Sequence, residues 1–169
     1  LMLDANSDPT VIDMISFEEH EGIHSMGIDL QYNTIHLLAN DGTMHALSLS
    51  NSSAITAMPE PTQSFDTFLP TTSGDYYGAN SEGVSKWDGS GWNSVQTISG
   101  QIVPDSATTM LEVNGILYTA FDGAGVLRYD LATNSPLSSW NTGNTLHSDD
   151  VTTMAVSGNQ LLLGSSDNG

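Results

Sequence analysis

The chain of 169 residues contains no cysteine and only two basic residues, Lys86 and Arg128. Without thiols it has no disulfides, no thiolate metal site and no cysteine nucleophile. Against 20 acidic residues, the two bases leave a formal net charge of −18. This charge repels the phosphates of nucleic acids and anionic membrane surfaces, so nucleic acid is excluded as a partner.

The sequence also lacks any apolar run near the ~18 residues that span a membrane, and it has no signal-peptide pattern. Because it begins at Leu1, we expect the natural start, with any leader, to lie outside it. Only 13% of the residues are charged, so the imbalance reflects missing bases and not acidic blocks. Such a surface suits a secreted or high-salt setting, with an acidic soluble protein of any compartment as the alternative.

One sequence pattern is present four times. Glycines at turn positions 42, 83, 125 and 169 lie 41, 42 and 44 residues apart. Before each glycine runs a short β-type segment ending in a small residue, and after the first three a second one begins, most clearly in residues 114–131. This spacing is typical of the four-stranded blades of a propeller.

Two further extended segments complete the unit. The upstream segments are 26–30, 65–69, 108–113 and 151–156, and the outer segments are 54–58, 92–98 and 137–140. Four strands per unit predict an all-β fold, a β-propeller of four-stranded up-and-down antiparallel blades. No apolar period of 3.6 residues persists for three turns, so we expect no long helix.

Residues 1–169 form, in this interpretation, a single propeller domain or propeller segment of about four blade equivalents. We predict a half blade, three blades and a half blade, at about 1–19, 20–60, 61–101, 102–144 and 145–169. The two halves are complementary and could pair, which would seal their edge strands. The chain could close alone, join a second chain in a ring of about eight blades, or belong to a longer propeller. The last two arrangements are favoured.

Residues 148–169 show an Asp-Val-Thr segment, a turn, a strand and a turn glycine, and Arg128, Tyr129 and Asp130 end a strand of the preceding unit. In this layout the chain resembles the propeller repeats of two-component regulators. Trp87 and Asp88 form one Trp-Asp dipeptide, as in Trp-Asp repeats, and quinoprotein propellers are more distantly similar. The resemblance implies a sensing or binding ectodomain that is extracellular, periplasmic or on the cell surface.

Two loops that precede inner strands carry acidic and imidazole side chains. The candidate ligand-binding residues there are Glu18, Glu19, His20, Glu21 and His24, and His147, Asp149 and Asp150. At the mouth of a propeller they would contact a protein, a glycan or a small ligand. Carboxylates and imidazoles that converge could also hold calcium or a transition ion. The alternative is a solvated acidic rim whose His and Asp side chains cap turns.

Calcium is a possible cofactor at a second place, near the start of the chain. Asp4, Asn6 and Asp8 have the alternating oxygen spacing that opens a calcium loop. Pro9 stands where that loop needs glycine, and Ile15 replaces the glutamate at its twelfth position. A turn between two strands explains the same residues.

The remaining polar and aromatic residues predict packing. His36 and His45 lie in strands among apolar residues. The aromatic residues expected to fill the spaces between blades are Trp87, Trp92, Trp140, Tyr76, Tyr77, Tyr118 and Tyr129, with a carbohydrate platform as the alternative. We expect Arg128 to pair with a carboxylate.

The chain has neither a Gly-x-Ser-x-Gly elbow nor a phosphate loop, and we predict no catalytic residue. A non-enzymatic binding, sensing or interaction module is therefore the first hypothesis. The alternatives are a lyase or glycosidase that uses acidic loop residues, and a structural repeat of a surface or self-assembling protein. The ring would be completed by a homo-oligomer or by contacts within a parent chain.

Overall fold

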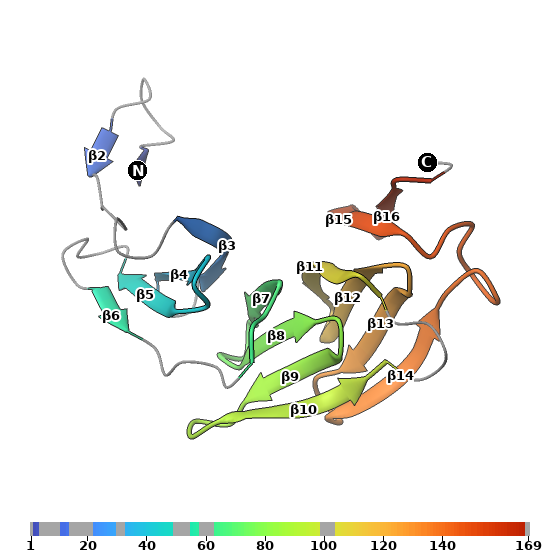
Figure 1. The fold of residues 1–169 in the computed structure, drawn as a ribbon, viewed down its shortest axis with the longest axis horizontal. Helices are drawn as coiled ribbons and strands as arrows, with labels where there is room; N and C mark the ends of the chain where they lie inside the picture. The colour runs from blue at the N-terminus through green and yellow to red at the C-terminus, as the bar shows by residue number, and fades with distance from the viewer. Residues whose placement is uncertain are drawn as a thin grey trace.

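In the computed structural model the chain forms an open arc of antiparallel sheets (Figure 1). The structure describes residues 22–29, 33–48, 63–98 and 104–167, and the backbone of three short strands at 2–3, 11–13 and 55–57. These residues contain no helix, so none of them forms a helix that could cross a membrane. The predicted all-β class is confirmed.

Three sheets have four strands each, and in all three the strands are adjacent in sequence order. The first contains β3 (Ile23–Asp29), β4 (Thr34–Ala39), β5 (Met44–Ser48) and β6 (Ile55–Ala57). The second contains β7 (Thr67–Pro70), β8 (Tyr76–Asn80), β9 (Gly83–Trp87) and β10 (Trp92–Thr97). The third contains β11 (Ser106–Val113), β12 (Ile116–Asp122), β13 (Gly125–Asp130) and β14 (Ser135–Trp140).

Two hairpins flank these blades. They consist of β1 (Met2–Leu3) with β2 (Val11–Asp13), and of β15 (Val151–Ser157) with β16 (Gln160–Ser165). The predicted half blade, three blades and half blade are therefore confirmed in the strand count. The exact unit boundaries stay a prediction.

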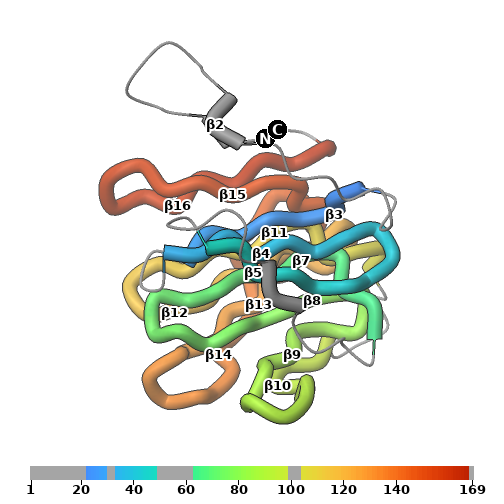
Figure 2. Tube along the Cα trace, turned by 90° about the vertical axis from the view of Figure 1, so that its left-hand side faces the viewer, coloured from blue at the N-terminus to red at the C-terminus, as the bar shows by residue number. Residues whose placement is uncertain are grey.

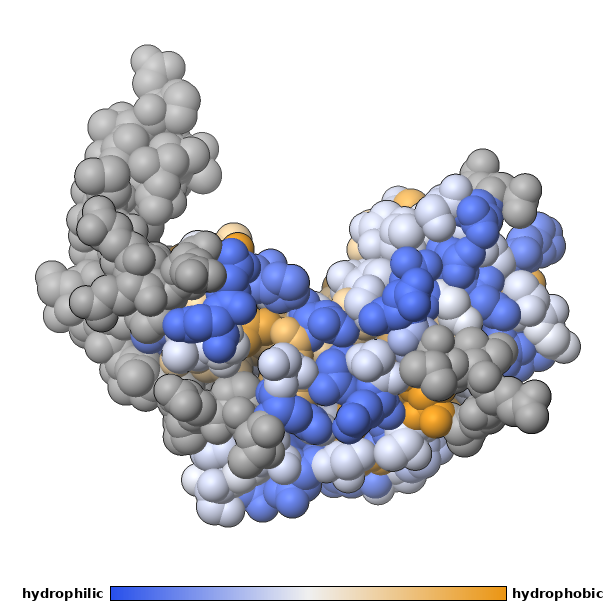
Figure 3. All heavy atoms as spheres, in the orientation of Figure 1, coloured by the Kyte–Doolittle hydropathy of each residue, from blue (hydrophilic) through white to orange (hydrophobic). Residues whose placement is uncertain are grey.

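The inner strands β3, β7, β11 and β15 lie on the concave side of the arc (Figure 1), and each contacts the next. Seen from the side, the hairpin β15–β16 lies above the inner strands β3, β7 and β11 (Figure 2). The space-filling view shows a largely hydrophilic face that is hollowed between the two ends of the arc (Figure 3). The arc thus leaves a gap between the first blade and the hairpin β15–β16.

The apolar core lies between the blades. Leu38 and Met44 of the first blade pack against Phe65 and Phe68, which lie just before and within β7 of the second. Buried apolar clusters also lie between the second and third blades, and between the third blade and the hairpin β15–β16. Because successive strand residues point to opposite faces, each blade covers both neighbours.

A bulge fixes the same register in three inner strands. Just before it, Ile23, Ala107 and Val151 stand opposite Ala39, Phe121 and Ser165. A one-residue slip would turn every side chain to the other face, so the bulge determines which residues meet the next blade. Equivalent positions can therefore be compared between blades.

Two turn glycines explain how the third strand approaches the fourth. Gly83 and Gly125 have φ angles of 138° and 74°, and a Cβ atom on them would collide with the carbonyl oxygens of Gln96 and Trp140. Gly42 also has a positive φ, of 87°, but nothing lies near its missing Cβ. Met44, Val84 and Val126 occupy equivalent positions in the third strands of the three blades, judged by their partners in the second strands. Gly83 directly precedes Val84, whereas Gly42 lies two residues before Met44. Gly42 is therefore one position earlier than Gly83.

The aromatic prediction is confirmed most clearly by Tyr77. Its side chain is fully buried between the second and third blades, with its ring centroid 6.1 Å from that of Tyr129. His36 is likewise buried, between the rings of Phe68 and Tyr76. Packing is thus the role of His36 in this structure.

The two cations lie beside aromatic rings. Lys86 Nζ is 2.9 Å from Asp75 Oδ2 and 5.5 Å from the centre of the Tyr77 ring. The guanidinium of Arg128 lies over the ring of Trp140, 4.6 Å from its centre, and its Nη1 donates to the carbonyl oxygen of Ser138 at 3.4 Å. In the described residues Arg128 therefore makes a cation–π contact in place of the expected ion pair.

Candidate functional site

The two predicted loop clusters differ in what the structure describes. The first cluster, Glu18, Glu19, His20 and Glu21, lies outside the described residues, as do the calcium candidates Asp4, Asn6 and Asp8. His24 is described, but it lies within β3 and not in a loop, because this strand begins three residues before the predicted segment. Its side chain is exposed.

The second cluster lies in the loop 141–150, which joins β14 to β15. The loop folds on itself because the carbonyl oxygen of Asn141 accepts hydrogen bonds of 2.9 Å from the N–H groups of Thr145 and Leu146. The side chain of Asn141 also accepts from the N–H of Gly143 at 2.9 Å. The loop is therefore a compact turn that holds its side chains in place.

Asp149 joins this loop to the neighbouring hairpin. Its two carboxylate oxygens accept hydrogen bonds from the N–H and the hydroxyl of Thr142, at 2.7 and 2.8 Å. Its carbonyl oxygen accepts from the N–H groups of Gly123 and Gly125, at 3.2 and 2.8 Å. These bonds fix the loop, so capping of a turn, the alternative to ligand binding, accounts for the position of the Asp149 side chain. Ligand binding by Asp149 stays a prediction.

Asp150 lies beside Asp167, which follows β16. A hydrogen bond with Asp167, partial burial and the negative charges of Asp167, Asp122 and Asp149 raise the pKa of Asp150 to about 6. Carboxylates that crowd together hold a proton that each would lose alone. Asp150 is thus a group in this region that can exchange a proton near neutral pH.

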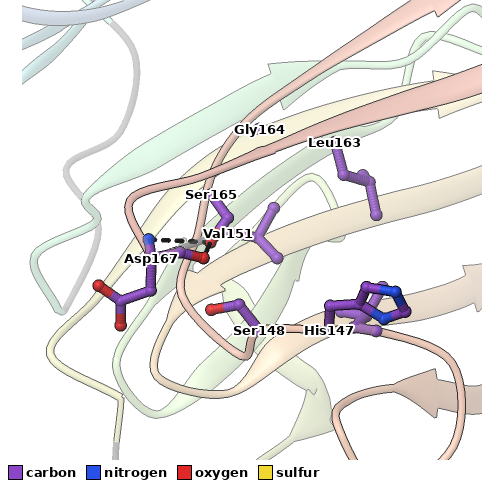
Figure 4. A pocket seen from close by; sticks show the side chains of 8 residues that line it. His147, Ser148, Val151, Leu163, Gly164, Ser165 and Asp167 are labelled. Atoms are coloured by element: carbon purple, nitrogen blue, oxygen red, sulfur yellow. Dashed lines mark hydrogen bonds between the residues drawn. The ribbon is translucent and has the colours of Figure 1, made fainter. Parts of the chain in front are cut away.

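A small hollow of about 150 Å³ opens between this loop and β16 (Figure 4). Its lining consists of Leu146, His147, Ser148, Val151, Leu163, Gly164, Ser165 and Asp167. The exposed imidazole of His147 lies on one side of the hollow and Asp167 on the other (Figure 4). Ser165 Oγ donates to the carbonyl oxygen of Asp167 at 2.8 Å and accepts from its N–H at 3.1 Å, which holds that side.

The structure therefore places His147 on one side of the hollow and Asp150 next to Asp167, which lines the other side, and it adds Ser148, Ser165 and Asp167 to this region. Ligand binding by His147 and Asp150 stays a prediction. Asp167 stands in the polar turn after β16, where the sequence showed only turn chemistry. No group of three His, Asp or Glu residues in the described parts of the chain is arranged to hold a metal ion. The arrangement can accept hydrogen bonds, attract cations and exchange a proton.

A second, wider hollow of about 430 Å³ lies between the second and third blades. Its lining comes from β10 and β14 with Leu127 of β13, and includes Val95, Gln96, Pro136 and Leu137. The sequence does not predict this hollow, because the hollow depends on the spacing of two outer strands and not on a motif. It carries no charged residue in its lining.

Comparison with known proteins identifies the fold. No protein-family model and no curated protein matches the sequence. The computationally designed Ika4 protein is similar in structure, with a TM-score of 0.65, 16% identity and 92% of both chains covered. The WD40 repeats of RRP9 match 77% of this chain and 40% of their own, with a TM-score of 0.56 and 14% identity.

An extracellular domain of a natural protein is similar as well. The extracellular domain of the putative one component system BT4673 from B. thetaiotaomicron has a TM-score of 0.61 and 15% identity. The match covers 85% of this chain but only 20% of that domain, so the chain spans about a fifth of its length. These likenesses confirm a β-propeller fold, and with it the resemblance to propeller repeats of sensor systems and Trp-Asp proteins.

Proposed function

We propose that the chain is a non-enzymatic binding and sensing module whose ligand-contact surface includes the loop 141–150 and the hollow beside it. The observation that carries this proposal is the position of His147. Its exposed imidazole borders a hollow in a loop that Asn141 and Asp149 hold rigid. Loops on a rigid scaffold are the usual place of binding residues.

The chemistry of this surface selects the ligand class. Asp150, Asp167 and the neighbouring carboxylates favour cationic groups and hydroxyl donors, as in a glycan, an amine or a basic protein segment. The hollow of about 150 Å³ is below the roughly 300–1,000 Å³ of clefts that enclose a drug-sized ligand. We therefore infer that it receives one group of a ligand and not a whole molecule.

An extracytoplasmic location fits this proposal. The sensor domain with a similar fold is extracellular, and an acidic surface with two bases is compatible with a secreted setting. Fold likeness alone does not carry a function, so the location rests on both observations together.

The experiment is a nuclear magnetic resonance titration of the ¹⁵N-labelled chain with a neutral oligosaccharide set, spermidine and CaCl₂. We expect saturable shifts at Thr142, His147 and Asp167 with at least one of these, weakened at least tenfold in affinity by His147→Ala. His45→Ala, on the first blade, is the matched control and should leave the affinity unchanged. Saturable binding that maps elsewhere, or none with all three probes, would contradict the proposed surface.

One observation favours the enzymatic alternative. The Asp150 and Asp167 carboxyls lie side by side, and the raised pKa of Asp150 suits a proton donor. Turnover of chromogenic glycosides or uronic acid polymers that Asp150→Asn abolishes would establish an enzyme. Unchanged substrates support the binding module.

A further inference from the structure

The inner strands show one position that is buried in three units and exposed in the first. The second residue after the bulge is Met110 in β11 and Met154 in β15, with exposed fractions of 6% and 9%, and the same position in β7 is Phe68, at 2%. In β3 it is Met26, which is 61% exposed. Ile23, at the buried position of Val151, is exposed too.

The burial of this position comes from the preceding unit. Met110 lies in one buried cluster with Tyr77 and Ala79 of the second blade, and Met154 lies in another with Ala120 of the third. A unit that precedes the first blade would therefore cover Met26 in the same way. Within the described residues nothing does so.

The other end of the arc presents the complementary surface. Leu162 in β16 occupies the position of His36 and Tyr77, whose exposed fractions are 2% and 0% because the next blade covers them. Leu162 is 50% exposed. The internal pair His36 and Phe68, with ring centroids 6.3 Å apart, shows the contact that Leu162 and Met26 would make.

The strands are complementary as well. The hairpin β15–β16 has the place and register of the first two strands of a blade, and β1–β2 precedes β3 as the last two strands of a blade would. In the described residues β16 pairs with β15 alone, and β1 with β2 alone. Pairing β16 with β1 makes a four-stranded blade and removes two exposed edges.

We propose that a second copy of this chain supplies the missing contact, with Leu162 of each copy against Met26 of the other. The two copies form a head-to-tail ring of eight blades, two of them shared. Successive inner strands contact one another three times along the chain, β3 with β7, β7 with β11 and β11 with β15, and the arc still remains open (Figure 1). This geometry favours a second copy over closure within one chain. A ring of eight keeps those contacts, and propellers hold up to about eight blades.

The test uses the absence of cysteine from the chain. The double variant Met26→Cys with Leu162→Cys is treated with a short bismaleimide and run on a denaturing gel. Both positions are exposed in one copy, so the variant should fold. We expect species of 35.8 kDa, twice the 17.9 kDa of one chain, to hold most of the linked protein.

The matched control is Met26→Cys with Asn159→Cys, which places the second thiol in the exposed hairpin turn. It should link at least tenfold more slowly. A double variant that links only within single chains would show that the chain closes alone, and one that links no faster than the control would show that no copy covers Met26. Either result overturns the proposal without affecting ligand binding at the loop 141–150.

Discussion

At the scale of single residues, two carboxylates on turns have opposite effects on stability. The pKa of Asp150 is raised to about 6, so its folded form favours the proton. Its contribution to stability is present at low pH and is lost as the pH rises through about 6. The pKa of Asp88 is lowered to about 2, chiefly by hydrogen bonds from Ser90 and Gly91, so its contribution is lost only as the pH falls through about 2.

Asp150→Asn should therefore raise the melting temperature at about pH 8 and change it little at about pH 4, since the neutral amide ends the repulsion from Asp167. Asp88→Asn is the matched control and should lower the melting temperature at about pH 8. Differential scanning calorimetry of both variants measures this. Shifts of the same sign at about pH 8 would show that Asp150 is not crowded by its neighbours.

Tyr77 carries the contact between the second and third blades. Its ring is fully buried, so Tyr77→Ala should lower the free energy of unfolding by about 3–5 kcal/mol. Val156→Ala, at an exposed position, should change it by no more than about 0.5 kcal/mol. Urea denaturation followed by tryptophan fluorescence gives both values, and equal losses would contradict the placement of the core between blades.

At the scale of elements, the turn before the third strand fixes the distance to the fourth. Gly125 and Gly115 have nearly equal φ angles, 74° and 75°, but only Gly125 lies against the backbone of Trp140. A side chain at either position costs about 1–2 kcal/mol for the left-handed backbone. At Gly125 it must also displace β14.

Gly125→Ala should thus destabilise the chain more than Gly115→Ala and speed amide hydrogen exchange in β14. The latter substitution should leave exchange in β14 unchanged, because nothing lies near its added Cβ. Exchange followed by mass spectrometry separates the two. Equal protection of the β14 amides in both variants would mean that the close approach of Gly125 to Trp140 does not affect the stability of β14.

The repeat in the sequence predicted these elements because turn glycines and strand alternation are local signals. It placed Gly42 among the equivalent glycines, whereas the structure places it one position earlier, since the turn after β4 has its own length. For the site, the sequence found His147, Asp149 and Asp150 because one loop carries them. It missed Asp167, which reaches Asp150 only through the register of β15 and β16.

At the scale of the whole molecule, the charge opposes the proposed ring. Two chains of −18 repel each other at close range, and added salt screens that repulsion. We expect the dissociation constant of the two copies to fall as NaCl rises from about 0.05 to 0.5 M, across which the Debye length shortens about threefold. Titration by fluorescence anisotropy measures this, and a constant that rises with salt would place attractive ion pairs at the interface.

The open arc with complementary half blades is the central claim, and its most direct test is the mass of the assembly in solution. Sedimentation equilibrium of the unmodified chain over a dilution series should give 35.8 kDa, twice the 17.9 kDa of one chain. Met26→Asp should return the mass to that of one chain, because it places a charge where the second copy binds. A mass of 17.9 kDa for the unmodified chain at every concentration would contradict the two-copy ring.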